Sequence, residues 1–121
     1  MPENFRRTNS TDSYKLARRA ALAAKDKKAE DVVILDLRKL TSITDYFVIC
    51  TGSVDIHVKS IADEIQKELK SNSKPWHIEG YQKLNWVLMD YVDIVVHIFQ
   101  EDTRSYYNLE KLWADAPVEE M

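Results

Sequence analysis

Cysteine is almost absent from this 121-residue chain, and its scarcity excludes several kinds of site. Cys50 is the only cysteine, so neither an intramolecular disulfide nor a thiolate metal cluster can form. Because Cys50 lies inside an apolar segment, we expect an inert core thiol. The histidines, His57, His77 and His97, match no metal-binding spacing. We therefore expect neither a metal site nor a cofactor.

Glycine and proline are also scarce, with 2 and 3 residues, which argues against a linker or a low-complexity protein. A hydrophobic content of 45% suffices for one core, and the length fits one domain. No apolar run approaches the ~20 residues that a membrane helix needs. The first 14 residues contain no hydrophobic segment of the kind found in secretory signals. We therefore expect a cytoplasmic protein that does not bind membranes.

The charges are unevenly distributed along the chain. Residues 1–28 carry eight Lys or Arg against three acids, whereas residues 90–121 carry eight acids against two basic residues. A net charge of −3 argues against direct nucleic-acid binding, which requires neutralisation of phosphates. Both regions are compatible with ordinary solvated faces, but the acidic one would also suit a basic protein partner.

The hydrophobic periodicity predicts helices and strands in mixed order. We expect helices at 13–27, 54–71 and 101–113, and strands at 30–37, 46–51, 76–78, 86–91 and 94–99. Ser13 is the expected N-cap of the first helix. Helix-linked and hairpin-linked strands together predict an α/β fold, with a mixed sheet of about five strands flanked by helices. Residues 13–116 would form this domain, between a disordered tail at 1–12 and a disordered acidic tail at 117–121.

The strands at 86–91 and 94–99 carry the clearest functional signal. Trp86, Leu88 and Asp90 share one face of the first strand, and we expect an exposed apolar patch bordered by an acid there. In the second strand, His97 is expected to be a hydrogen-bonded core or interface histidine. Aromatic anchors separated by acids, without a recognisable catalytic set, are typical of a docking surface.

The expected helix at 101–113 is rich in aromatic residues. Acids at its start suit the positive end of a helix dipole. Helical spacing predicts that Tyr106, Leu109 and Trp113 share one side, whereas Tyr107 points elsewhere.

A nucleotide-binding transferase is the enzyme alternative. Thr51, Gly52 and Ser53 lie at a strand-to-helix turn, where backbone N–H groups can hold a phosphate. Transfer would also need several carboxylates converging on Mg²⁺. Asp55 has His57 rather than an acid two residues later, so the sequence does not favour this activity.

Several segments of the chain, taken in order, resemble the ribosomal silencing factors, also called the Iojap family. The matching segments are LDL at 35–37, TDYFV at 44–48, EG at 79–80, WVLMDY at 86–91, VVHIF at 95–99 and RSYYNLEKLW at 104–113. Together they span roughly residues 13–116, nearly the whole chain.

This resemblance implies a non-enzymatic translational repressor. Family members bind the large ribosomal subunit through the ribosomal protein L-fourteen and sterically block joining of the small subunit, which lowers translation under starvation or in stationary phase. The resemblance also implies a homodimer in the free state, and a topology similar to nucleotidyltransferases without their catalytic carboxylates. A role in large-subunit assembly is an alternative. The partner-binding residues carried over from matching motifs are Trp86, Leu88, Asp90, Tyr91, Asp93, Arg104 and Tyr107.

The chain departs from the family pattern at two places. Val92 stands where the family often has glycine, and a positive φ would be strained there, so we expect a differently shaped hairpin. Residues 54–56 replace a Ser-x-Arg pattern, which leaves the role of that turn open.

Overall fold

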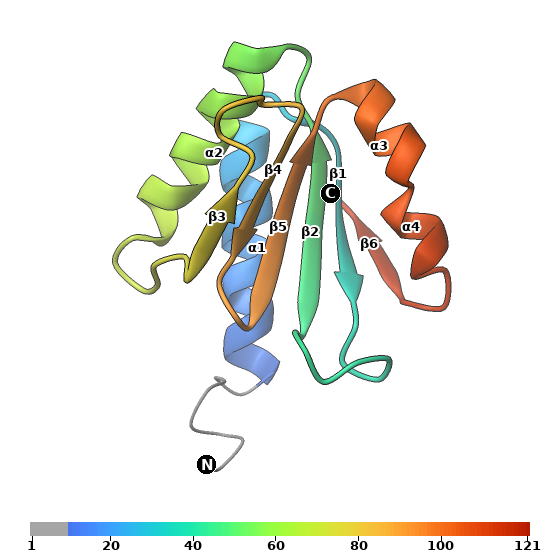
Figure 1. Cartoon of the computed structure of the whole chain (residues 1–121). Helices are drawn as coiled ribbons and strands as arrows, with labels where there is room; N and C mark the ends of the chain where they lie inside the picture. Colours follow the sequence, from blue (N-terminus) through green and yellow to red (C-terminus); the bar gives the residue numbers. More distant parts are fainter. Residues whose placement is uncertain (1–9) are drawn as a thin grey trace.

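The computed structural model describes residues 10–121, which form one mixed sheet with helices on both faces (Figure 1). The strands are β1 (Glu30–Asp36), β2 (Tyr46–Thr51), β3 (His77–Glu79), β4 (Trp86–Asp90), β5 (Ile94–Phe99) and β6 (Val118–Glu120). Their order in the sheet is β3-β4-β5-β2-β1-β6. The β2–β5 pair is parallel and the other pairs are antiparallel. The predicted mixed α/β sheet is confirmed, with six strands instead of about five.

Two long helices, α1 (Ser10–Asp26) and α2 (Asp55–Leu69), cover one face of the sheet (Figure 1). Small side chains on α1, such as Ala17, Ala20 and Ala24, are fully buried and allow the helix to approach the strands closely. On α2, the buried stripe includes Ile61 and Ile65. Cys50 lies in this core, where burial raises the pKa of its thiol to about 12, as expected for an inert thiol.

A smaller layer, α3 (Glu101–Tyr107) and α4 (Leu109–Leu112), lies on the opposite face. It stands beside β1, β2 and β6 in Figure 1, and its Leu109 and the nearby Trp113 pack on a second core that includes Leu35 and Phe99. Within residues 10–121, no helix covers the β3–β4 side of this face, and none is long and apolar enough to cross a membrane.

The first helix begins earlier than predicted. It starts at Ser10, so the expected N-cap at Ser13 is wrong, and Ser13 is instead a buried residue within the helix. Its hydroxyl donates a 2.7 Å hydrogen bond to Asp45 Oδ2, which joins α1 to the start of β2. The expected tail at 1–12 lies outside the described residues for positions 1–9, and positions 10–12 are helical.

The prediction of a disordered acidic tail at 117–121 is wrong. Val118–Glu120 forms β6, which pairs antiparallel with β1 at the edge of the sheet. Glu119 accepts a hydrogen bond from the Tyr14 hydroxyl (2.7 Å) and pairs with the Arg18 guanidinium (3.1 Å). These contacts with α1, together with the β1 ladder, order a segment too polar to be recognised as a strand.

The predicted continuous helix at 101–113 is also wrong, because it breaks at Asn108. This residue adopts the left-handed conformation, with φ 47° and ψ 60°, which asparagine tolerates better than most residues. Its side chain accepts a hydrogen bond from Lys111 N and so caps α4. The break separates the directions of Tyr106 and Leu109: Tyr106 is 81% exposed, whereas Leu109 packs on the sheet.

Candidate functional site

The uncovered part of the sheet presents the face that the sequence predicts on β4. Trp86, Leu88 and Asp90 are half-buried and alternate with the fully buried Val87 and Met89. This alternation confirms that Trp86, Leu88 and Asp90 share one face. We call this surface the open face and define its centre by these three residues.

Aromatic rings continue the open face toward α3 and α4. The Trp86 ring lies 4.7 Å from the Tyr107 ring and 4.9 Å from the Phe99 ring, measured between centroids. Further along the sheet, Phe47 lies 4.4 Å from His97 and 6.1 Å from Trp113. Because these rings belong to three strands and the α3–α4 layer, they form one cluster only in the folded chain, and Phe99 and His97 are buried within it.

His97 lies in β5 directly opposite Leu88 of β4 and is buried, as the sequence predicts. Its Nδ1 accepts a 3.1 Å hydrogen bond from Trp86 Nε1–H, so the expected hydrogen bond is confirmed. Burial disfavours the charged imidazolium and lowers the pKa of His97 to about 3. The ring is therefore neutral near pH 7 and remains a hydrogen-bond acceptor for the indole.

The hairpin after Asp90 keeps a conformation that suits glycine, although Val92 occupies the position. Val92 has φ 73°, which is the left-handed region that glycine favours. Asp93 N–H donates to Tyr91 C=O (2.9 Å), which closes a three-residue turn, and Asp90 Oδ1 accepts from Val92 N–H (2.8 Å). Positive φ is costly for a β-branched residue, so this turn is strained.

Two of the predicted partner-binding residues do not reach the open face. Tyr91 is 4% exposed and packs in the core beneath α1 and α2, on the opposite side of the sheet. Burial raises the pKa of its hydroxyl to about 12. Asp93 is also buried, in the turn that follows. Alternation places Tyr91 with Val87 and Met89, which explains why sequence proximity to Asp90 did not bring it to the same face.

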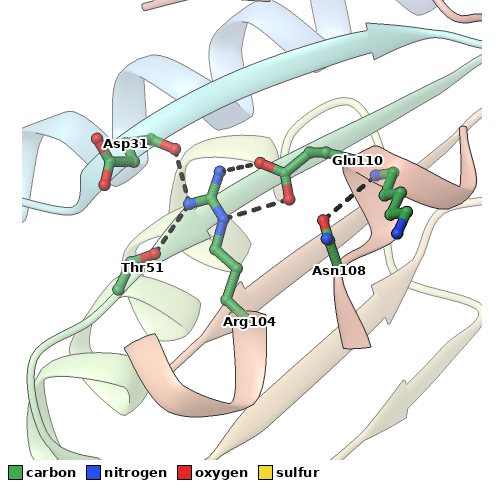
Figure 2. Close-up of polar contacts among 6 residues, drawn as sticks. Asp31, Thr51, Arg104, Asn108 and Glu110 are labelled. Carbon is green, nitrogen blue, oxygen red and sulfur yellow. Dashed lines mark hydrogen bonds and ion pairs between the residues drawn. The ribbon is translucent and has the colours of Figure 1, made fainter. Parts of the chain in front are cut away.

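Arg104, also predicted to contact a partner, makes several contacts within the fold. It is 9% exposed, and its Nη1 donates to Asp31 C=O and to Thr51 Oγ1, both at 2.8 Å (Figure 2). Its Nη2 pairs with Glu110 Oε2 at 2.7 Å. The guanidinium thus ties α3 to α4 and to the ends of β1 and β2. Most of its donors are used within the fold, so Arg104 holds the α3–α4 layer in place.

The chain is similar to proteins of one known family. The family model described as ribosomal silencing factor during starvation matches residues 10–121. A relative from Bacillus subtilis, named ribosomal silencing factor RsfS, is 47% identical over 103 residues, covering 84% of this chain and 87% of the relative. The chain belongs to the ribosomal silencing factor family. The family resemblance seen in the sequence is therefore confirmed.

Similar proteins include one of known structure and one from mitochondria. A solved structure of a Chromobacterium violaceum protein is similar with a TM-score of 0.81 and 34% identity, covering 84% of this chain and 85% of that one. A mouse relative, named mitochondrial assembly of ribosomal large subunit protein 1, is 32% identical over 93 residues. Those residues are 74% of this chain and 41% of the mouse protein.

Two amide groups of the strand-to-helix turn considered for nucleotide binding are engaged within the fold. Gly52 N–H donates to Phe99 C=O (2.8 Å), and Ser53 N–H donates to His57 Nδ1 (2.9 Å). Asp55 accepts a 2.6 Å bond from Gln100. A phosphate bound to these two amide groups would have to displace those partners.

Sequence reasoning did not identify the exposed or half-buried state of three apolar residues on this side of the sheet. Phe47 was not considered because its strand reads as core, and it becomes part of the open face only through the β2–β5 pairing. Leu112 and Tyr106 are strongly exposed on the α3–α4 layer. The signal that could have identified them is Asn108, since asparagine is the residue most suited, after glycine, to a left-handed helix break.

Proposed function

We propose that this chain is a translational repressor that binds the large ribosomal subunit through its open face and blocks joining of the small subunit. The partner on the subunit would be a basic ribosomal protein, the protein L-fourteen. Repression would act in the cytoplasm under starvation or in stationary phase. The observation that carries this proposal is an apolar face with an acidic margin, which no helix covers within residues 10–121, in a member of the silencing-factor family.

The physical case rests on the composition of the open face. Trp86, Leu88 and Tyr107 offer large apolar areas that become buried when a partner docks, and aromatic residues are frequent anchors of such interfaces. Asp90 has one oxygen hydrogen-bonded within the hairpin and is half-buried, so it can accept an Arg or Lys from a basic partner. The apolar residues would provide affinity, and Asp90 would provide orientation.

The proposed mechanism involves no chemical reaction. A protein docked on the surface that faces the small subunit occupies space required for joining, so repression follows from steric exclusion. Of the residues predicted for partner contact, Trp86, Leu88, Asp90 and Tyr107 remain in this proposal. Tyr91, Asp93 and Arg104 act indirectly, through the core, the hairpin and the α3–α4 layer.

A role in large-subunit assembly is the second candidate. The name of the mouse relative supports it, because that protein is described as an assembly protein of the mitochondrial large subunit. Assembly and silencing use the same partner and differ in consequence. We also propose that the free protein is a homodimer, which light scattering of the purified chain can test.

Sedimentation separates these functions. Purified protein is mixed with isolated large subunits, small subunits are added, and the mixture is resolved on a gradient. Silencing predicts co-sedimentation with large subunits and loss of joined ribosomes. Co-sedimentation with normal joining would instead support assembly. Absence of co-sedimentation at moderate salt would overturn both, and stabilisation by nucleoside triphosphate with Mg²⁺ would then revive the transferase alternative.

A further inference from the structure

We propose that His97 is a positioning residue that fixes the Trp86 indole for docking on the partner. This inference rests on the proposed ribosome-binding function, and it assigns a role to a residue that the partner does not touch. Trp86 carries one polar atom, Nε1–H, which donates inward to His97 Nδ1 at 3.1 Å. The indole is therefore held in one orientation by a directional bond in addition to its packing.

The packing around the indole leaves it few alternatives. Phe99, from the strand opposite, and Tyr107, from α3, lie within 5 Å of Trp86 between ring centroids. Apolar contacts alone permit the ring to tilt or flip, because they have little directional preference. The bond to His97 selects the rotamer in which the nitrogen points into the sheet.

The other nitrogen of His97 shows that this arrangement has a cost. Because Nδ1 accepts a bond, the neutral ring carries its proton on Nε2. Nε2 is buried and has no hydrogen-bond partner among the residues that the structure describes. A buried unpaired N–H is destabilising, and phenylalanine at this position would avoid it. If position 97 served packing alone, phenylalanine would suffice. A residue that must also accept a hydrogen bond from Trp86 needs an acceptor such as the imidazole.

This orientation also limits what can dock on Trp86. Its N–H is used inside the protein, so the partner meets only the apolar and π-electron surface of the ring. The matching group on the partner is then an aliphatic side chain or an Arg or Lys cation above the ring, and a hydrogen-bond acceptor would gain nothing there. A cation is consistent with Asp90, which lies on the same face of β4.

A direct test measures the indole proton in the wild-type protein. The Trp86 Nε1–H signal can be assigned in a ¹⁵N–¹H spectrum with Trp86→Phe, and its hydrogen exchange compared with that of the exposed Trp76. Slow exchange for Trp86 supports the bond to His97. Exchange as fast as that of Trp76 would overturn the proposal without any reference to the ribosome.

Two substitutions then separate positioning from packing. His97→Phe keeps an aromatic ring and removes the acceptor, whereas His97→Asn places an amide oxygen near the position of Nδ1. We expect His97→Phe to free the indole proton and weaken large-subunit binding by about tenfold, without lowering the thermal midpoint. His97→Asn should retain most of the binding. Equal binding by wild type and His97→Phe would contradict the proposal.

A double-mutant comparison shows whether His97 acts through Trp86. In a Trp86→Ala background, His97→Phe should cause no further loss of binding, because the group it positions is gone. An additional loss of the same size would assign His97 an independent role and overturn the inference. If wild type itself fails to bind large subunits, the proposed function fails, and the indole exchange still decides the orientation.

Discussion

The rings of Tyr107 and Trp86 lie 4.7 Å apart and join α3 to β4 across the open face. Tyr107 is 51% exposed, so this contact extends the apolar surface beyond the sheet without burying it. We expect Tyr107→Ala to weaken large-subunit binding by about tenfold while changing the free energy of unfolding by less than about 1 kcal/mol. Leu22→Ala is the matched control, since Leu22 is similarly exposed (45%) on α1. Equal effects of the two variants on binding would contradict the assignment.

Arg104→Met should act mainly by lowering the stability of the fold, and not by removing a direct contact with a partner. Removing the guanidinium leaves the Asp31 carbonyl, the Thr51 hydroxyl and the Glu110 carboxylate without their shared partner. We expect a loss of about 2–3 kcal/mol in the free energy of unfolding, measured by urea denaturation. Lys111→Met, at an exposed basic residue of α4, should change stability by less than about 0.5 kcal/mol. An unchanged stability for Arg104→Met would restore Arg104 as a candidate contact residue.

Val92→Gly should stabilise the protein. The turn requires φ 73° at this position, which costs a β-branched residue more than glycine loses in chain entropy. We expect a gain of about 1 kcal/mol in the free energy of unfolding, and a smaller change for Val92→Ala, which keeps the Cβ atom. Urea denaturation of the three proteins measures the difference. A loss of stability in Val92→Gly would show that the valine side chain contributes more than the turn costs.

The buried His97 predicts acid sensitivity with a defined sign. Its pKa is lowered from 6.5 to about 3 in the folded protein, so the unfolded chain binds the additional proton between those values. The contribution of His97 to the free energy of unfolding is at its maximum above pH 6.5. It falls as the pH decreases toward 3, by up to about 1.4 kcal/mol per pH unit. The difference in unfolding free energy between wild type and His97→Phe should follow this slope from pH 6.5 to 5, where few carboxylates titrate. A difference independent of pH would contradict the neutral buried state.

The two central strands were predictable because their own sequences suffice to indicate a strand. Tyr46–Thr51 and Ile94–Phe99 are apolar, rich in β-branched residues and bounded by polar positions, and the structure confirms both boundaries. The β6 strand depends on something else. Its three residues are mainly acidic, and they become a strand only by pairing with β1 and by contacts such as Arg18–Glu119. No local pattern contains that information.

The candidate site was predictable to a similar degree. Alternation along β4 suffices to place Trp86, Leu88 and Asp90 on one face, and the structure agrees. The burial of Arg104 was not predictable, because its partners come from residues 31, 51 and 110 and meet only in three dimensions. The homodimer and the nucleotidyltransferase-like topology stay predictions.

Comparison of two tryptophan substitutions tests the central claim most directly. Trp86→Ala and Trp76→Ala remove the same side chain, but Trp86 lies on the open face, whereas Trp76 lies beside β3 and is 70% exposed. Affinity for isolated large subunits would be measured for both, with circular dichroism to verify folding. The account predicts that Trp86→Ala loses binding by about a hundredfold and that Trp76→Ala binds as wild type. Wild-type binding by a folded Trp86→Ala would contradict the open face as the ribosome-binding surface.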